Sequence, residues 1–284
     1  GMLANTADAG GTEYNTVDGT MWFLRAIGRH VDRTGDADLG KSLLPTIDDI
    51  VDHHLAGTRF GIRVDDDGLI TQGADGWALT WMDARVDGEP ITARRGKPVE
   101  VNALWIDGLD AAARIARATG HDATRFEQLL AQARRSFEQR FRIAGGGLFD
   151  VVDSPTGDDV TTRPNQLVAS SLTSCPLTDD DRRGVLAATA PLRTSLGLRS
   201  LTPASDAYVG RHRGSPRDRD GAYYQGTVWP WLIGPLVDTL VAVGDRVPRP
   251  RQWLLGAALA AALGFLTKGP LALVIPALVV APIV

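Results

Sequence analysis

The feature that most constrains the fold is a spacing of three or four residues between apolar side chains, repeated along most of the chain. An apolar residue at every third or fourth position forms one apolar stripe on a helix. Four long stretches have this spacing: roughly residues 21–31, 43–55, 101–116 and 126–141. Shorter candidate helices lie at about 164–174, 179–193 and 227–243. We therefore predict an all-α chain built from helical hairpins.

Three long polar segments separate these helices, at roughly residues 58–98, 144–163 and 197–225. Loops of this length in a compact domain usually have a function. The run Asp65-Asp66-Asp67-Gly68 lacks the alternating ligands and terminal Glu of a calcium loop, so we interpret it as a hairpin turn. We expect the loops to gather at one end of the hairpins and to form the functional site.

Composition excludes several classes of function. The formal net charge is -4, which gives no reason to expect a nucleic-acid partner. The single cysteine, Cys175, has no neighbouring base that would activate it, so a structural thiol is the better interpretation. The five histidines have no zinc-ligand spacing. We expect no metal site and no cofactor.

Two aromatic segments indicate carbohydrate chemistry. Residues 79–84 read LTWMDA, and residues 222–231 read AYYQGTVWPW. Tryptophan faces pack on the apolar faces of sugars, and an acid beside such a ring can protonate a glycosidic oxygen. Asp83, two residues after Trp81, is the candidate general acid, because an apolar neighbour favours the protonated carboxyl. The alternatives are that Trp81 fills the core and that Asp83 caps a turn.

Five motifs, taken together, resemble the C-terminal catalytic domain of bacterial glycogen debranching enzymes, the amylo-alpha-1,6-glucosidase family. They cover about residues 1–244 and occur in the order 13–18 (EYNTVD), 79–84 (LTWMDA), 96–105 (GKPVEVNALW), 163–166 (RPNQ) and 225–231 (QGTVWPW). The resemblance implies an incomplete α/α toroid of the six-hairpin glycosidase type. It also implies inverting hydrolysis of α-1,6-linked glucose stubs on an α-glucan such as glycogen, limit dextrin or a malto-oligosaccharide.

The same resemblance implies roles for individual residues. Asp83 matches the general acid. The positions that would line the sugar pocket are Asn15, Asp18, Trp81, Glu100, Asn102, Trp105, Asn165, Gln225 and Trp229. Glu100 has two alternatives: a structural role at the start of a helix, where the dipole favours an acid, or the role of catalytic base.

The chain departs from the family pattern at three places. The family usually has His where Tyr224 stands. Relatives begin earlier, with a sandwich domain and further helices. They also continue past the helix that follows Trp229 to a segment of the type Ser-Glu-Ile-Phe-Asp, whose Glu is similar in place to a catalytic base, and no such segment follows Asp245. We therefore predict little hydrolysis of α-1,6 stubs by the chain as it stands.

The sequence changes character near residue 246, which predicts a helical toroid fragment at 1–245 and a separate tail at 246–284. From Trp253 to Val284 the only charged residue is Lys268. The tail resembles a membrane segment of the lipid-linked-sugar glycosyltransferases, and we predict a membrane-like helical segment at 253–284. A buried helical hairpin is the alternative. We expect a cytoplasmic protein, with membrane tethering through the tail as an option.

Two further hypotheses remain beside the hydrolase. The chain could be a non-catalytic or vestigial carbohydrate-binding domain tethered to a membrane. It could also be a fusion of a glycosidase fragment with part of a glycosyltransferase, since the change near residue 246 is abrupt.

Overall fold

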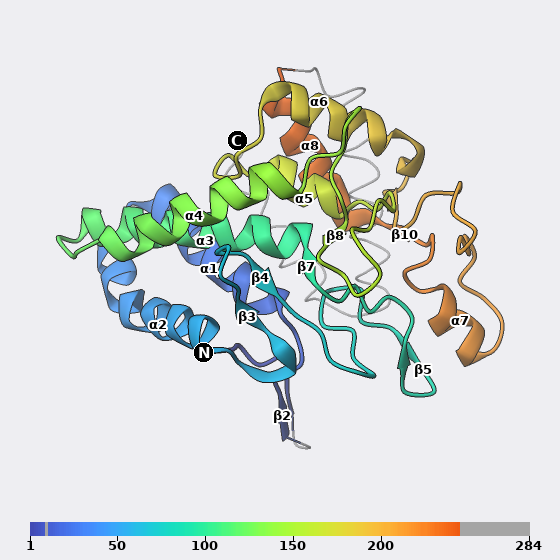
Figure 1. Cartoon of the computed structure of the whole chain (residues 1–284), viewed down its shortest axis with the longest axis horizontal. Helices are drawn as coiled ribbons and strands as arrows, with labels where there is room; N and C mark the ends of the chain where they lie inside the picture. Colours follow the sequence, from blue (N-terminus) through green and yellow to red (C-terminus); the bar gives the residue numbers. More distant parts are fainter. Residues whose placement is uncertain (9–10, 245–284) are drawn as a thin grey trace.

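The computed structural model describes residues 1–8 and 11–244 and is rich in helix (Figure 1). The α-helices are α1 (Asp18–Thr34), α2 (Ala37–Ala56), α3 (Val99–Ala118), α4 (Thr124–Arg140), α5 (Asn165–Ser171), α6 (Asp179–Ala188), α7 (Pro216–Ala222) and α8 (Ile233–Ala242). Short 3-10 turns occur at η1 (Arg59–Gly61), η2 (Ala190–Leu192) and η3 (Pro230–Leu232). The four long predicted helices are present as α1 to α4.

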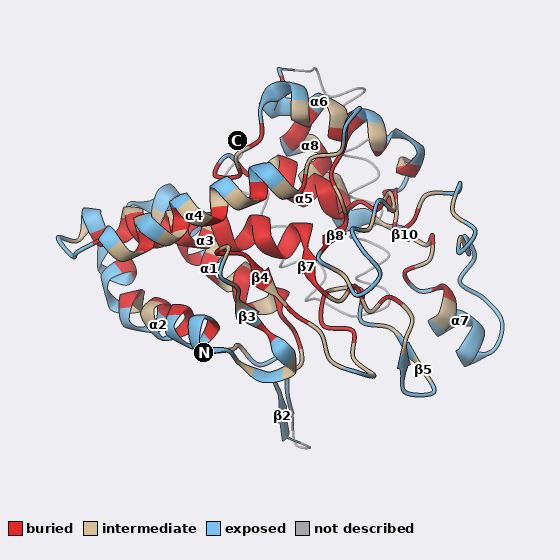
Figure 2. Ribbon diagram, in the orientation of Figure 1, coloured by how far each residue is buried: buried red, intermediate tan, exposed pale blue. Residues whose placement is uncertain are grey.

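Helix α3 lies at the centre of the fold (Figure 2). It packs against α1, α2, α4 and α5. Leu104, Trp105 and Ile106 are consecutive and all have 0 % exposed surface, so this helix is buried on more than one face. The stripes predicted for its neighbours face the core, for example Met21 and Leu24 of α1.

Alternate helices form an inner row. In this row α1 packs on α3, α3 on α5, and α5 on α8. The intervening helices pack outside it: α2 against α1 and α3, α4 against α3, and α6 against α5 and α8 (Figure 1). Each hairpin therefore gives one helix to the inner row and one to the outer layer.

The long loops gather at the N-terminal ends of the inner helices. Val17, just before α1, donates its N–H to Leu79 O at 2.8 Å, and Val99 at the start of α3 donates to Asp150 O at 3.0 Å. The N–H of Ser200 bonds Thr227 O at 2.9 Å ahead of α8. Loops distant in sequence thus meet at one end of the inner row, as the sequence predicts.

Short antiparallel pairs brace these loops. They are β1 (Thr6–Asp8) with β2 (Gly11–Glu13), β3 (Arg63–Val64) with β4 (Ile70–Thr71), β5 (Arg85–Val86) with β6 (Glu89–Pro90), β7 (Lys97–Pro98) with β8 (Val151–Val152), and β9 (Leu198–Arg199) with β10 (Val228–Trp229). The predicted turn at Asp65–Gly68 is confirmed as the β3–β4 hairpin, with Gly68 at φ 81°. An all-α description therefore omits ten short strands within the described part of the chain.

Several predicted helices begin or end elsewhere. The expected helix at 179–193 stops at Ala188 and continues as η2, where Pro191 lies. The expected helix at 227–243 opens with β10 and η3, because Pro230 has no N–H for a helical ladder, and α8 begins only at Ile233. Helix α7 was not predicted.

Nothing in the described ranges, 1–8 and 11–244, is a helix with both the length and the apolar character needed to span a bilayer. The predicted membrane segment at 253–284 lies outside the described residues, as does the whole of the 246–284 domain. Membrane association and the domain boundary therefore remain predictions.

Candidate active site

The two aromatic segments meet in one cluster over the N-terminal ends of the inner helices. The ring of Trp81 is met edge-on by three rings, with centroid distances of 5.3 Å to Tyr224, 5.6 Å to Trp229 and 5.0 Å to Trp231. Tyr224 stacks on Trp229 at 5.3 Å with an interplanar angle of 15°. Trp81 and Trp229 are partly exposed and Trp231 is 40 % exposed, so the cluster presents an aromatic surface to solvent.

Asp83 lies at the edge of this cluster. It is exposed, and its Oδ1 accepts a hydrogen bond of 3.0 Å from the hydroxyl of Tyr224. The contact joins residues that are 141 positions apart in the sequence. An exposed carboxyl group beside partly exposed aromatic rings can exchange a proton with a bound ligand.

Asp18 supplies a second carboxylate to the same end of the fold. It is the first residue of α1, is 6 % exposed, and accepts a hydrogen bond from the hydroxyl of Thr16. Burial raises the pKa of Asp18 to about 6, against the bond from Thr16, and the carboxylates of Glu100 and Asp83 add to the rise. Glu100 and Asp83 therefore lie near enough to affect the protonation of Asp18.

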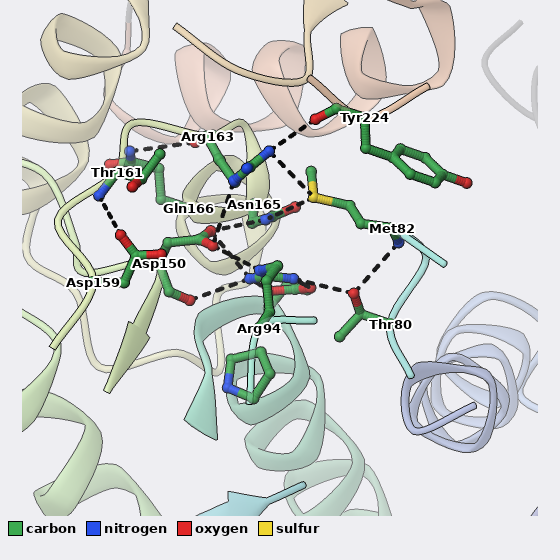
Figure 3. Close-up of polar contacts among 12 residues, drawn as sticks. Thr80, Met82, Arg94, Asp150, Asp159, Thr161, Arg163, Asn165, Gln166 and Tyr224 are labelled. Carbon is green, nitrogen blue, oxygen red and sulfur yellow. Dashed lines mark hydrogen bonds and ion pairs between the residues drawn. The ribbon is translucent and has the colours of Figure 1, made fainter. Parts of the chain in front are cut away.

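A buried charge network of Arg94, Asp150 and Glu100 lies next to the cluster, and Figure 3 shows the polar contacts of Arg94 and Asp150. The guanidinium of Arg94 donates to Asp150 Oδ2 at 2.6 Å and to Glu100 Oε2 at 2.7 Å. All three side chains are no more than 2 % exposed. Burial alone would lower the pKa of Arg94, but the two carboxylates raise it, so Arg94 stays charged.

Asn165, the first residue of α5, links this network to the aromatic cluster. Its Nδ2 donates to Asp150 Oδ1 at 2.8 Å, and its Oδ1 accepts from Trp81 Nε1 at 2.8 Å. Asn165 has 0 % exposed surface. In this structure it therefore fixes the plane of the Trp81 ring from beneath.

Glu100, Asn102 and Trp105 of α3 are equally buried. Glu100 is 1 % exposed, and its carboxylate accepts a hydrogen bond from the guanidinium of Arg94. Asn102 bonds both backbone groups of Ile70, at 2.7 and 3.0 Å, and Trp105 Nε1 donates to Gly68 O at 3.2 Å. These last two side chains attach the β3–β4 hairpin to α3, and both have 0 % exposed surface in this structure.

Gln225 and Asn15 are partly exposed. Gln225 Oε1 accepts from Arg163 at 3.1 Å, and its Nε2 donates to the carbonyl of Ile91 at 3.4 Å. Asn15 Oδ1 accepts from Asn5 at 2.9 Å. The structure thus brings Asp18, Trp81, Asp83, Gln225 and Trp229 to one end of the inner row, with the α3 residues and Asn165 beneath.

Four residues of this region were missed by the sequence analysis as parts of the site. Arg94 and Asp150 lie in polar loops where no periodicity marks them. Arg163 belongs to the motif at 163–166 and Tyr224 to the aromatic segment at 222–231, but neither was predicted as a site residue. Arg163 Nη1 donates to the Tyr224 carbonyl at 2.9 Å. For Arg94 the only signal in the sequence was the arginine pair Arg94-Arg95 in a long loop.

A cavity of about 520 Å³ lies toward the opposite end of the inner helices. Its lining includes Asp32 in the last turn of α1 and Asp238 of α8. Asp32 is about 20 Å along the helix from Asp18. An ion pair of 2.8 Å joins Arg25 to Asp107 in its wall. The cavity contains none of the predicted site residues.

Comparison with solved structures identifies the fold. An uncharacterized conserved protein from Thermus thermophilus is similar with a TM-score of 0.62 and 14 % identity, over 94 % of this chain and 76 % of that one. The GH63 mannosylglycerate hydrolase of the same organism gives 0.61 and 12 %, over 92 % and 72 %. A GH78 family rhamnosidase of Bacillus sp. GL1 gives 0.54 and 12 %, over 87 % and 22 %.

The fold is therefore one that glycoside hydrolases use, and an exposed carboxyl group beside aromatic rings suits that class of protein. Sequence comparison is more specific: the chain belongs to the amylo-alpha-1,6-glucosidase family, whose sequence model matches residues 1–272. The resemblance expected at about residues 1–244 is confirmed, and the match extends into the first part of the apolar tail. No curated protein sequence matches the chain.

Proposed function

We propose that the site hydrolyses single α-1,6-linked glucose residues on a branched α-glucan, with inversion and with Asp83 as the general acid. The observation that supports this most is the position of Asp83, exposed at the edge of the cluster of Trp81, Tyr224, Trp229 and Trp231. Membership in the amylo-alpha-1,6-glucosidase family supports the choice of linkage.

In this mechanism the carboxyl group of Asp83 gives its proton to the glycosidic oxygen as the bond to the anomeric carbon breaks. Water attacks that carbon from the opposite face of the sugar and loses a proton to a second carboxylate. Trp81 and Trp229 would pack on the sugar, while Asn15 and Gln225 would bond its hydroxyls. Asn165 would hold the Trp81 ring in place through its bond to Nε1. Glu100 would support the site through Arg94, whereas Asn102 and Trp105 would hold the β3–β4 hairpin against α3.

The second carboxylate decides how fast the reaction can be. Glu100 and Asp150 both accept hydrogen bonds from Arg94, so neither carboxylate is available to take a proton from water. Asp18 is the neighbouring carboxylate without a cationic partner among the described residues, and it is only 6 % exposed. A buried base has poor access to water, so we expect slow turnover.

The pairing of Glu100 and Asp150 with Arg94 also favours a second candidate function, binding of α-glucan without turnover. A site whose nearby carboxylates are neutralised by Arg94 keeps its aromatic surface and its polar groups. Such a site would still select a pyranose by ring packing and hydroxyl contacts.

One pair of measurements separates these functions. Glucose release from a branched limit dextrin and calorimetric binding of malto-oligosaccharides are measured for the wild type and for Asp83→Asn. Slow release that Asp83→Asn lowers by at least about 100-fold, with binding retained, supports the hydrolase. Binding without release in either protein supports the binding module. Neither binding nor release would refute both proposals.

A further inference from the structure

The only side chain among the described residues that donates a hydrogen bond to Asp83 is Tyr224. Its hydroxyl lies 3.0 Å from Asp83 Oδ1. Tyr224 is 5 % exposed, whereas Asp83 is exposed. One oxygen of the carboxyl group thus faces a buried donor, and the other has no side-chain donor within the described part of the chain.

The ring that presents this hydroxyl is held on several sides. It stacks on Trp229 at 5.3 Å, meets Trp81 edge-on at 5.3 Å, and meets Tyr223 edge-on at 4.9 Å. Its backbone carbonyl accepts a hydrogen bond from Arg163 at 2.9 Å. A ring packed in this way cannot change rotamer without displacing its neighbours, so the hydroxyl has a fixed position.

We infer that Tyr224 is the positioning residue of Asp83: its hydroxyl holds Oδ1, so that Oδ2 is the oxygen that bears the proton and faces the ligand. This inference rests on the proposed hydrolase function. In the step, the O–H bond at Oδ2 breaks, the glycosidic oxygen gains the proton, and the carbon–oxygen bond to the leaving group breaks. The hydrogen bond from Tyr224 then ends on a carboxylate and becomes charge-assisted.

Tyr224 itself remains a donor throughout this step. Burial raises the pKa of the Tyr224 hydroxyl, and the charge of Asp83 raises it further. The hydroxyl therefore keeps its proton at the pH values where a carboxyl group can act as an acid.

A first test needs no catalysis. The Cζ resonance of Tyr224, assigned by its loss in Tyr224→Phe, is compared by carbon NMR in the wild type and in Asp83→Asn at one neutral pH. We expect its chemical shift to differ between the two proteins, because Asp83→Asn replaces the carboxyl group to which the hydroxyl donates. An equal chemical shift in the two proteins would overturn the inference.

A second test concerns the reaction. Tyr224→Phe keeps the ring and removes the donor, and a bond to a charged group of this kind corresponds to about 10- to 100-fold in rate. We expect kcat on limit dextrin to fall by that factor with KM within about twofold, and no further loss when Tyr224→Phe is added to Asp83→Asn. The matched control is Tyr223→Phe, whose ring touches Tyr224 but whose hydroxyl does not bond Asp83.

Unchanged kcat in Tyr224→Phe, or an equal further loss in the Asp83→Asn background, would contradict a positioning role. A wild type that releases no glucose would instead refute the hydrolase proposal, while the NMR measurement would still decide whether Tyr224 responds to Asp83.

Discussion

Arg94 gives the sharpest test of the network beneath the site. Its guanidinium makes bonds to Glu100 and Asp150 and a contact of 3.3 Å to Thr80, and all three charged side chains are no more than 2 % exposed. Arg94→Met keeps much of the volume, leaves Glu100 without its cation and leaves Asp150 with only the longer contact of 3.9 Å to Arg163. Loss of one member of a buried ion pair costs about 3–5 kcal/mol. We expect the free energy of unfolding to fall by about that amount.

The assay is equilibrium unfolding in urea, followed by tryptophan fluorescence and by circular dichroism. Arg95→Met is the matched control, because Arg95 pairs at 2.6 Å with Asp75, which is 97 % exposed, and exposed pairs contribute about 0–1 kcal/mol. Adding Glu100→Gln to Arg94→Met should recover part of the loss, since one unpaired charge is removed. If Arg94→Met had the same free energy of unfolding as Arg95→Met, the account of the network would be refuted.

Three further predictions concern charge, ligand binding and backbone. Because the pKa of Asp18 is raised to about 6, the folded protein binds more protons than the unfolded chain between about pH 4 and 6, and stability falls as pH rises through that range. The free energy of unfolding of Asp18→Asn, relative to that of the wild type, should therefore rise by up to about 3 kcal/mol between pH 4 and pH 7 in urea titrations. A difference that does not depend on pH would contradict this. Trp229→Ala should weaken malto-oligosaccharide binding about tenfold in calorimetry, whereas Trp77→Ala, outside the cluster, should not; equal effects would count against the aromatic surface. Gly96→Ala should lower the free energy of unfolding by more than about 1 kcal/mol, because φ is 111° and an added Cβ would lie 2.7 Å from the carbonyl oxygen of Val152; unchanged urea midpoints would refute that constraint.

The helices could be predicted because each has a buried stripe of its own. In α4 the stripe of Phe126, Leu130, Ala133 and Phe137 is buried, as periodicity predicts. The start of α8 could not be found in this way, because Trp229 and Pro230 continue the apolar pattern while pairing with β9 and forming η3. Periodicity records which side chains are apolar and not which backbone groups pair.

The site could be predicted only in part for a related reason. The motif segments containing Trp81 and Trp229 point to the aromatic cluster, because each places tryptophan beside polar residues. Nothing in the sequence assigns Arg94 to Glu100 and Asp150, because the ion pairs depend on how the loops fold over separations of 6 and 56 residues. Asn102 and Trp105 belong to a family motif, yet their polar atoms bond the β3–β4 hairpin in the core.

The most direct test of the proton-donor role of Asp83 compares two substrates that differ in their leaving group. A glucosyl stub on limit dextrin needs its leaving oxygen protonated, whereas fluoride leaves α-glucosyl fluoride without a proton. General acid catalysis contributes about 100- to 10,000-fold. We predict that Asp83→Asn lowers kcat/KM for limit dextrin by at least about 100-fold and for α-glucosyl fluoride by less than about fivefold. Equal losses on the two substrates, or no loss on limit dextrin, would contradict the assignment of Asp83 as the proton donor.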